Sequence, residues 1–120
     1  MIAPMPWKLT VRSGPKVQKE RYAELAVALD VLERRAQQLA RDLPRDAVDV
    51  KLKRFEPIQQ VSARLELAGP ERLLPSLRAG VDVRGDGSVE PYRGRVRREV
   101  IEQRKGESPY EALRRAVASS

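Results

Sequence analysis

Residues 21–43, RYAELAVALDVLERRAQQLARDL, decide the fold. Their apolar positions recur at alternating steps of four and three, which places them on one stripe of an α-helix. The stripe consists of Leu25, Leu29, Leu32, Ala36, Leu39 and Leu43. Pro44 ends the pattern, because proline has no amide donor and disfavours helical dihedral angles at the residue before it. We predict a helix over about 21–43 that packs on a sheet. The alternative, a helix that pairs with a partner, has fewer than three heptads to support it.

Alternating apolar and polar residues predict strands on both sides of this helix. The predicted strands are, in chain order, 7–13, 16–20, 47–55, 59–68, 80–84 and 89–92. The short connection between 47–55 and 59–68 predicts that these two pair antiparallel. Asp86-Gly87 predicts a hairpin, because both residue types accept a positive φ. Residues 93–104 fit a strand or a helix, and we favour a strand through Glu102.

The sequence Ser108-Pro109-Tyr110-Glu111 predicts the start of a second, shorter helix over about 109–118. Serine is a preferred N-cap and proline a preferred first helical residue. A glutamate three residues after the serine completes a capping box.

These elements predict one α+β domain over residues 1–120. It has two layers: a mainly antiparallel β-sheet, with the long helix and the C-terminal helix on one face. Since the apolar strand residues must face the helices, the other face carries the polar ones. Its predicted cations and aromatic are Lys8, Arg12, Lys51, Lys53, Phe55, Arg64 and Arg84.

The composition excludes most catalytic chemistry. The chain has no cysteine and no histidine, so thiolates, disulfides, imidazole bases and the usual triads and metal sites are absent. We therefore expect a protein that is not an enzyme, with no catalytic residues, no metal and no cofactor. No apolar run approaches the ~20 residues that span a bilayer, and no secretory signal precedes the first strand. We expect a cytoplasmic protein without a membrane partner.

The net charge of +7 is compatible with a polyanionic partner. The competing explanation is a GC-rich genome, since arginine outnumbers lysine threefold and asparagine is absent. The densest run of cations is Arg93-Gly94-Arg95-Val96-Arg97-Arg98.

Our functional hypothesis is a basic binding module that contacts RNA, or an assembly containing RNA, through the Lys/Arg-bearing sheet face. Cations on a rigid surface neutralise phosphates and release counterions, and Phe55 and Tyr92 could stack on bases. The predicted phosphate-binding residues are Lys51, Lys53, Arg64, Arg93, Arg95, Arg97 and Arg98. The alternative is a structural protein, either a homo-oligomer or a small subunit of a larger complex, whose polar face or edge strand is covered by a neighbour.

Overall fold

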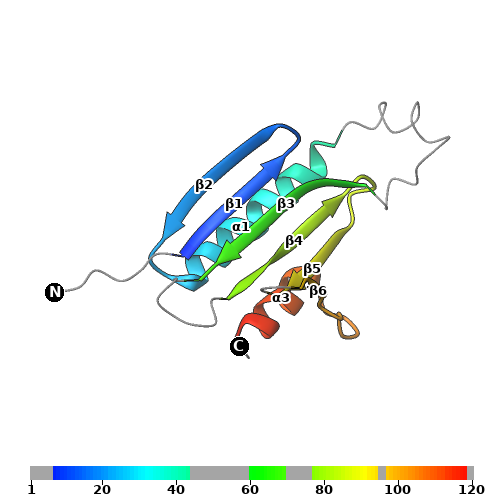
Figure 1. Ribbon diagram of the computed structural model, residues 1–120. Coiled ribbons are helices and arrows are strands. Elements are labelled where there is room, and N and C mark those ends of the chain that lie inside the picture. The colour runs from blue at the N-terminus through cyan, green and yellow to red at the C-terminus, as the bar shows by residue number, and fades with distance from the viewer. Residues whose placement is uncertain (1–6, 44–59, 70–76, 95–96, 119–120) are drawn as a thin grey trace.

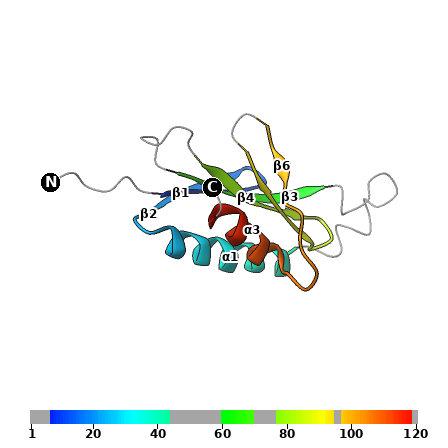
Figure 2. The same cartoon turned by 90° about the horizontal axis from the view of Figure 1, so that it is seen from below.

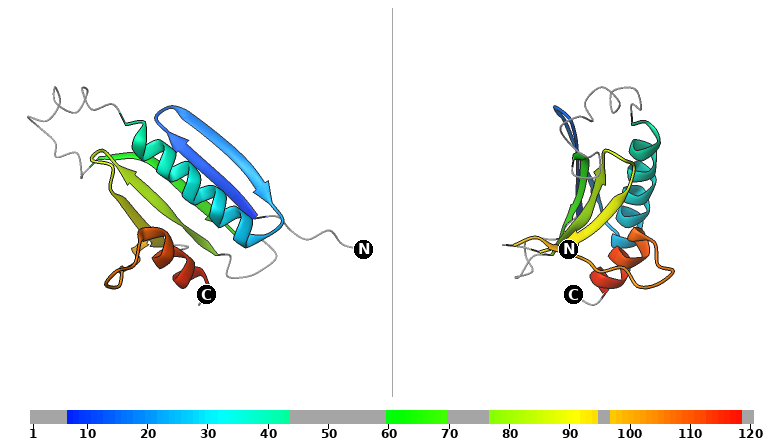
Figure 3. Two further views of the ribbon diagram at one scale, coloured as in Figure 1. Left: turned by 180° about the vertical axis from the view of Figure 1, so that it is seen from behind. Right: turned by 90° about the vertical axis from the view of Figure 1, so that its right-hand side faces the viewer.

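The computed structural model describes residues 7–43, 60–69, 77–94 and 97–118. The elements follow in the order β1 (Trp7–Ser13), β2 (Lys16–Tyr22), α1 (Leu25–Arg41), β3 (Val61–Ala68), β4 (Arg78–Arg84), β5 (Val89–Arg93), β6 (Glu99–Val100) and α3 (Pro109–Ala118). The strands form one antiparallel sheet in the order β2-β1-β3-β4-β5-β6 (Figure 1). Both helices lie on one face of that sheet (Figures 2 and 3). The predicted two-layer α+β fold is confirmed.

The apolar stripe of α1 is the centre of the core. Ala28, Leu29, Leu32 and Ala36 are buried against the inward residues of β1, β3 and β4. Helix α1 therefore packs on its own sheet, as predicted. Its predicted start was four residues too early, because Arg21 and Tyr22 continue β2 and pair with Lys8 and Trp7 of β1. Glu24 occupies the N-cap without a side-chain hydrogen bond, which explains why the sequence carries no clear start signal.

Tight turns join β1 to β2 and β4 to β5, and the hairpin predicted at Asp86-Gly87 is confirmed. In the β1–β2 turn Gly14 has a φ of +58°, and in the β4–β5 turn Gly87 has a φ of +88°. Asp86 does not share the positive φ that the Asp-Gly signal allows. Instead its carboxylate accepts hydrogen bonds from the amide of Ser88 at 2.9 Å and from its hydroxyl at 2.6 Å. These hydrogen bonds lower the pKa of the Asp86 carboxyl.

Strand β3 has different neighbours from those expected. It pairs with β1 on one side and with β4 on the other, so residues 63–68 have no edge left for the predicted pairing with 47–55. The predicted strand 47–55 itself lies outside the described residues. The β1–β3 pairing joins segments separated by a whole helix, and sequence adjacency gives no signal for it.

The strand predicted through Glu102 is wrong in length. Strand β6 has only two residues, and the Ile101 amide donates to the carbonyl of Pro91 at 2.9 Å before the chain leaves the sheet.

The capping box of α3 is confirmed. The Glu111 amide donates to Ser108 Oγ, and the Ser108 amide donates to Glu111 Oε1, both at 3.0 Å. Helix α3 covers β4 and β5 through Tyr110, Leu113 and Val117.

Candidate polyanion-binding face of the sheet

The face of the sheet away from the helices, here called the open face, is strongly polar. Leu9 and Val11 of β1 point to the helices, so Lys8, Thr10 and Arg12 point the other way. The strand register then aligns polar residues in two rows across the sheet. One row runs Arg12, Arg64, Asp82 and Glu90, and the next runs Lys19, Thr10, Glu66, Gly80 and Tyr92.

On the β4–β5 side of the open face, cations and acids are paired. Asp82 is completely buried and is held by Arg64 in a bidentate pair, with Nε to Oδ1 at 2.7 Å and Nη2 to Oδ2 at 3.1 Å. Arg98 Nη2 also donates to Asp82 Oδ2 and reaches Glu90 Oε1 at 3.2 Å. Arg84 Nη2 donates to the same Glu90 oxygen at 2.6 Å. The hydrogen bond to Asp82 raises the pKa of Arg64, so this guanidinium stays charged.

Tyr92 lies beneath these arginines rather than on the surface. Its side chain is only 3% exposed, and the guanidinium carbons of Arg64 and Arg98 lie 5.5 Å and 4.7 Å from its ring centroid. Its hydroxyl donates to Glu66 Oε1 at 2.8 Å. Burial, together with the hydrogen bond to Glu66, raises the pKa of Tyr92, which keeps the phenol protonated as a donor. Tyr92 is thus enclosed by cations and cannot serve as the base-stacking platform that the sequence suggested.

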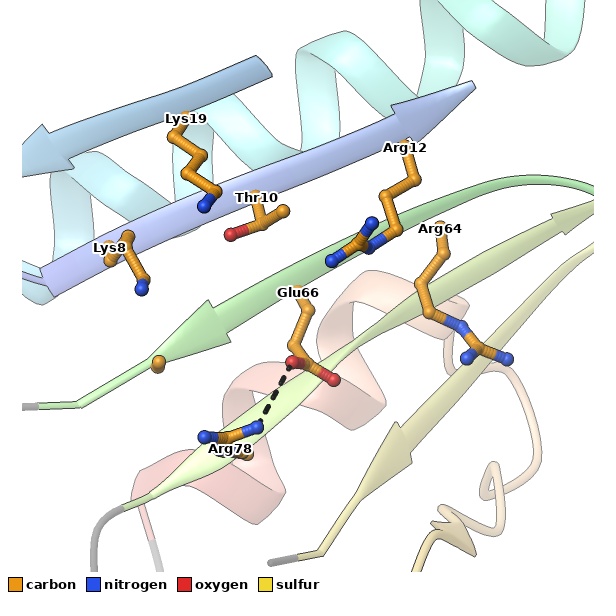
Figure 4. A pocket seen from close by; sticks show the side chains of 8 residues that line it. Lys8, Thr10, Arg12, Lys19, Arg64, Glu66 and Arg78 are labelled. Carbon is orange, nitrogen blue, oxygen red and sulfur yellow. Dashed lines mark ion pairs between the residues drawn. The ribbon is translucent and has the colours of Figure 1, made fainter. Parts of the chain in front are cut away.

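On the β1–β2 side, a depression of about 140 Å³ is lined by more cations than acids among the described residues. The residues that line this basic depression are Lys8, Thr10, Arg12, Lys19, Arg64, Glu66, Ala68 and Arg78. Figure 4 shows the Lys8 and Lys19 ammonium groups and the Arg12 guanidinium around Thr10, with Glu66 turned towards Arg78. The Glu66–Arg78 pair is long, at 4.0 Å. Within the described part of the chain, Lys8, Arg12 and Lys19 form no ion pair, so the depression keeps an excess of positive charge.

The predicted site residues have different outcomes. Arg64 lines the basic depression but is tied to Asp82, and Arg98 belongs to the same ion-pair cluster. Arg93 pairs with Ala79, whose side chain is in the core, so strand alternation directs Arg93 to the helix side of the sheet end. Arg97 is exposed beyond β5. The remaining predicted residues, Lys51, Lys53, Phe55 and Arg95, lie outside the described residues.

The predicted phosphate-binding residues did not include Lys8 and Arg12, which were expected only on the same sheet face, and Lys19 and Arg78 were not predicted on that face at all. Val17, the single valine of β2, pairs with Arg12 on the open face and is 46% exposed, so it is not an inward anchor for this strand. The side chain of Glu20 turns to the helix layer, where it accepts hydrogen bonds from Arg35 Nη1 at 2.7 Å and from the Tyr22 hydroxyl. The Glu20–Arg35 pair fixes the phase of β2, but it joins residues 15 positions apart, so local alternation gives no signal for it.

Other polar clusters join elements of the fold. Arg114 of α3 donates to Glu33 at 2.6 Å and to Asp30 at 2.9 Å on α1, and these ion pairs join the two helices.

Across the described ranges, no three acidic side chains lie close enough together to hold a metal ion. Neither α1 nor α3 combines the length and apolarity of a membrane-crossing helix.

The open face has two sides. Ion pairs join the side chains of the β4–β5 side, whereas the β1–β2 side carries Lys8, Arg12 and Lys19 without an ion-pair partner among the described residues. No protein-family model matches the chain, and comparisons with curated proteins and with solved structures found no match either.

Proposed function

We propose that this protein is a non-enzymatic module that binds RNA by its phosphates, on the open face of the sheet. One observation carries the proposal: Lys8, Arg12 and Lys19 gather around the Thr10 hydroxyl without an ion-pair partner among the described residues. Charged side chains that fold close to one another repel, and the acids that could neutralise them are held elsewhere. Glu66 is drawn towards Arg78 and Tyr92, while Asp82 is held by Arg64 and Arg98. An anionic ligand would relieve this repulsion.

The shape of the site favours a polymer over a small anion. Lys8, Thr10 and Arg12 alternate along β1, where every second residue advances about 6.7 Å, and Lys19 lies on the next strand about 4.8 Å away. The cations therefore extend along β1 and onto β2, in an arrangement that can follow successive phosphates.

RNA is favoured over duplex DNA because neither described helix resembles a recognition helix. The exposed side of α1 mixes arginines with the acids Asp30, Glu33 and Asp42, which would repel a phosphate backbone in the major groove.

The proposal is tested by fluorescence anisotropy with a labelled 12-nucleotide RNA over a range of salt concentrations. The variant Lys8→Gln/Lys19→Gln removes two charges from the basic depression. Arg34→Gln/Lys105→Gln is the matched control, since it removes two exposed charges from α1 and from the loop before α3. Each phosphate contact contributes about 0.7 to the slope of log K against log salt for single strands, so the first variant should lose roughly 1.4 in slope. Equal losses in both variants, or no binding by the wild type, would refute the proposal.

A second candidate, assembly with other copies, is favoured by the edge strand β2. Among the described strands, β2 has a paired neighbour on one side only, and its Val17 is 46% exposed. Light scattering coupled to size exclusion tests this function directly. A mass of 13.6 kDa that does not depend on concentration would exclude self-assembly.

A further inference from the structure

We infer that single-stranded RNA places an unpaired base on the guanidinium group of Arg64, beside the basic depression, an inference that rests on the proposed function. Proteins that bind single strands stack bases on arginine planes as well as on aromatic rings. Arg64 lines the basic depression (Figure 4) and pairs across the sheet with Arg12. It therefore brings a planar group next to the cations that contact phosphate.

The guanidinium group of Arg64 is held in one orientation by two buried neighbours. Its Nε and Nη2 edge donates to Asp82 at 2.7 Å and 3.1 Å, and Asp82 is fully buried. Its Cζ atom lies 5.5 Å from the ring centroid of Tyr92, and the Tyr92 hydroxyl is itself fixed by Glu66 at 2.8 Å. The Arg64 side chain is nevertheless 41% exposed, so the face of the guanidinium turned away from the ring is left for a ligand.

This fixed plane distinguishes Arg64 from the other cations of the basic depression. Among the residues described, Arg12 forms no ion pair, and Arg78 forms only one of 4.0 Å. Their guanidinium groups are free to turn towards a phosphate, which accepts hydrogen bonds from many directions. Lys8 and Lys19 carry point charges without a plane. A base that stacks on Arg64 meets a group that is already ordered, so stacking costs little side-chain entropy.

The occupant is a single strand, because the bases of a duplex are stacked on one another and their faces are covered. Strands β1 and β3 are adjacent and about 4.8 Å apart, so a flexible strand can keep its phosphates on Arg12 while an unpaired base turns onto Arg64. The base contributes stacking energy that the phosphates alone do not supply.

The test compares three ligands by fluorescence anisotropy at one salt concentration. They are a 12-nucleotide RNA of mixed sequence that does not pair with itself, an abasic chain of the same length, and the RNA annealed to its complement. Stacking of one base contributes about fivefold or more to affinity, so the wild type should bind the single strand at least fivefold more tightly than the abasic chain.

The variant Arg64→Lys keeps the charge and removes the plane. It should reduce the preference for the RNA over the abasic chain to below about twofold, with little change in the Kd of the abasic chain. Arg84→Lys is the matched control, because it makes the same exchange in the neighbouring pair with Glu90, away from the basic depression, and should keep the preference. Circular dichroism checks that both variants are folded.

A second readout needs no substitution and remains valid if Arg64→Lys does not fold. The ring current of a stacked base should shift the NMR signal of the Arg64 Nε–H group when the single strand binds, and the abasic chain and the duplex should leave that signal in place. An abasic chain that binds as tightly as the RNA, a preference that Arg64→Lys leaves unchanged, or an unshifted Arg64 signal would overturn this inference and leave the proposed function standing. Failure of every ligand to bind would overturn both.

Discussion

Replacement of Asp82 by asparagine tests the ion-pair cluster that Asp82 forms with Arg64 and Arg98 on the open face. The side chain of Asp82 is fully buried between two guanidinium groups, and the substitution keeps its size while it removes the charge that both of them share. Breaking a buried ion pair at one partner costs about 3–5 kcal/mol when the other charge stays buried. The side chains of Arg64 and Arg98 are 41% and 35% exposed, so water can solvate them after the change, and the expected loss falls to about 2 kcal/mol.

The loss in free energy of unfolding is measured by urea unfolding followed by circular dichroism. In a thermal scan with the same readout, a loss of about 2 kcal/mol should lower the melting temperature by roughly 8 °C for a chain of this size. Asp42→Asn, an exposed carboxylate at the end of α1, is the control and should change stability by less than about 0.5 kcal/mol. The double variant Asp82→Asn/Arg98→Gln should be less destabilised than the sum of the single changes, because the two residues interact. A cost below about 0.5 kcal/mol for Asp82→Asn, or strict additivity in the double variant, would refute the proposed role of the cluster.

Three further changes test the fold around the site. Gly80→Ala should destabilise by about 3 kcal/mol or more, because the new Cβ would lie 2.0 Å from the backbone oxygen of Leu65; an unchanged urea midpoint would contradict the close packing of β3 and β4. Ser108→Ala should lower the free energy of unfolding by about 1 kcal/mol, because the α3 N-cap loses its side-chain hydrogen bond. Thermal unfolding measures this loss, and an unchanged stability would mean that the cap does not stabilise the helix. Hydrogen bonds from Arg115 lower the pKa of Glu107 from 4.5 to about 2, so this contact stabilises the fold fully above pH 4.5 and is lost as the pH falls through about 2. Carboxyl NMR titration should find that midpoint, and Arg115→Gln should raise the pKa towards its ordinary value while the Arg104 amide still donates to Glu107. A normal pKa in the wild type would show that the pair is not formed.

The sequence predicts those parts of the fold that short-range physics determines. The leucine stripe of α1 identifies its buried face, and the capping box at Ser108 fixes where α3 begins. The start of α1 could not be predicted, because Tyr22 satisfies its backbone by pairing with Trp7 across the sheet, and that partner is distant in sequence. The same reason explains the incorrect neighbour expected for β3, whose pairing with β1 spans the helix.

The candidate site was predictable in its face and only partly in its members. Alternation in β1 and β3 placed Lys8, Arg12 and Arg64 correctly on the side away from the helices. It could not show that Asp82 neutralises Arg64, since that pairing depends on the register between β3 and β4. It also could not place Lys19, because the single valine of β2 points to the open face rather than into the core.

The most direct test of the account is an amide chemical-shift map of the ¹⁵N-labelled protein titrated with the 12-nucleotide RNA. The largest changes should fall on β1 and β2 around Lys8, Thr10, Arg12 and Lys19, and they should fade as salt is added. Changes centred on α1 or α3, or a spectrum that RNA leaves unaltered, would contradict the claim that the unpaired cations of the open face bind phosphate.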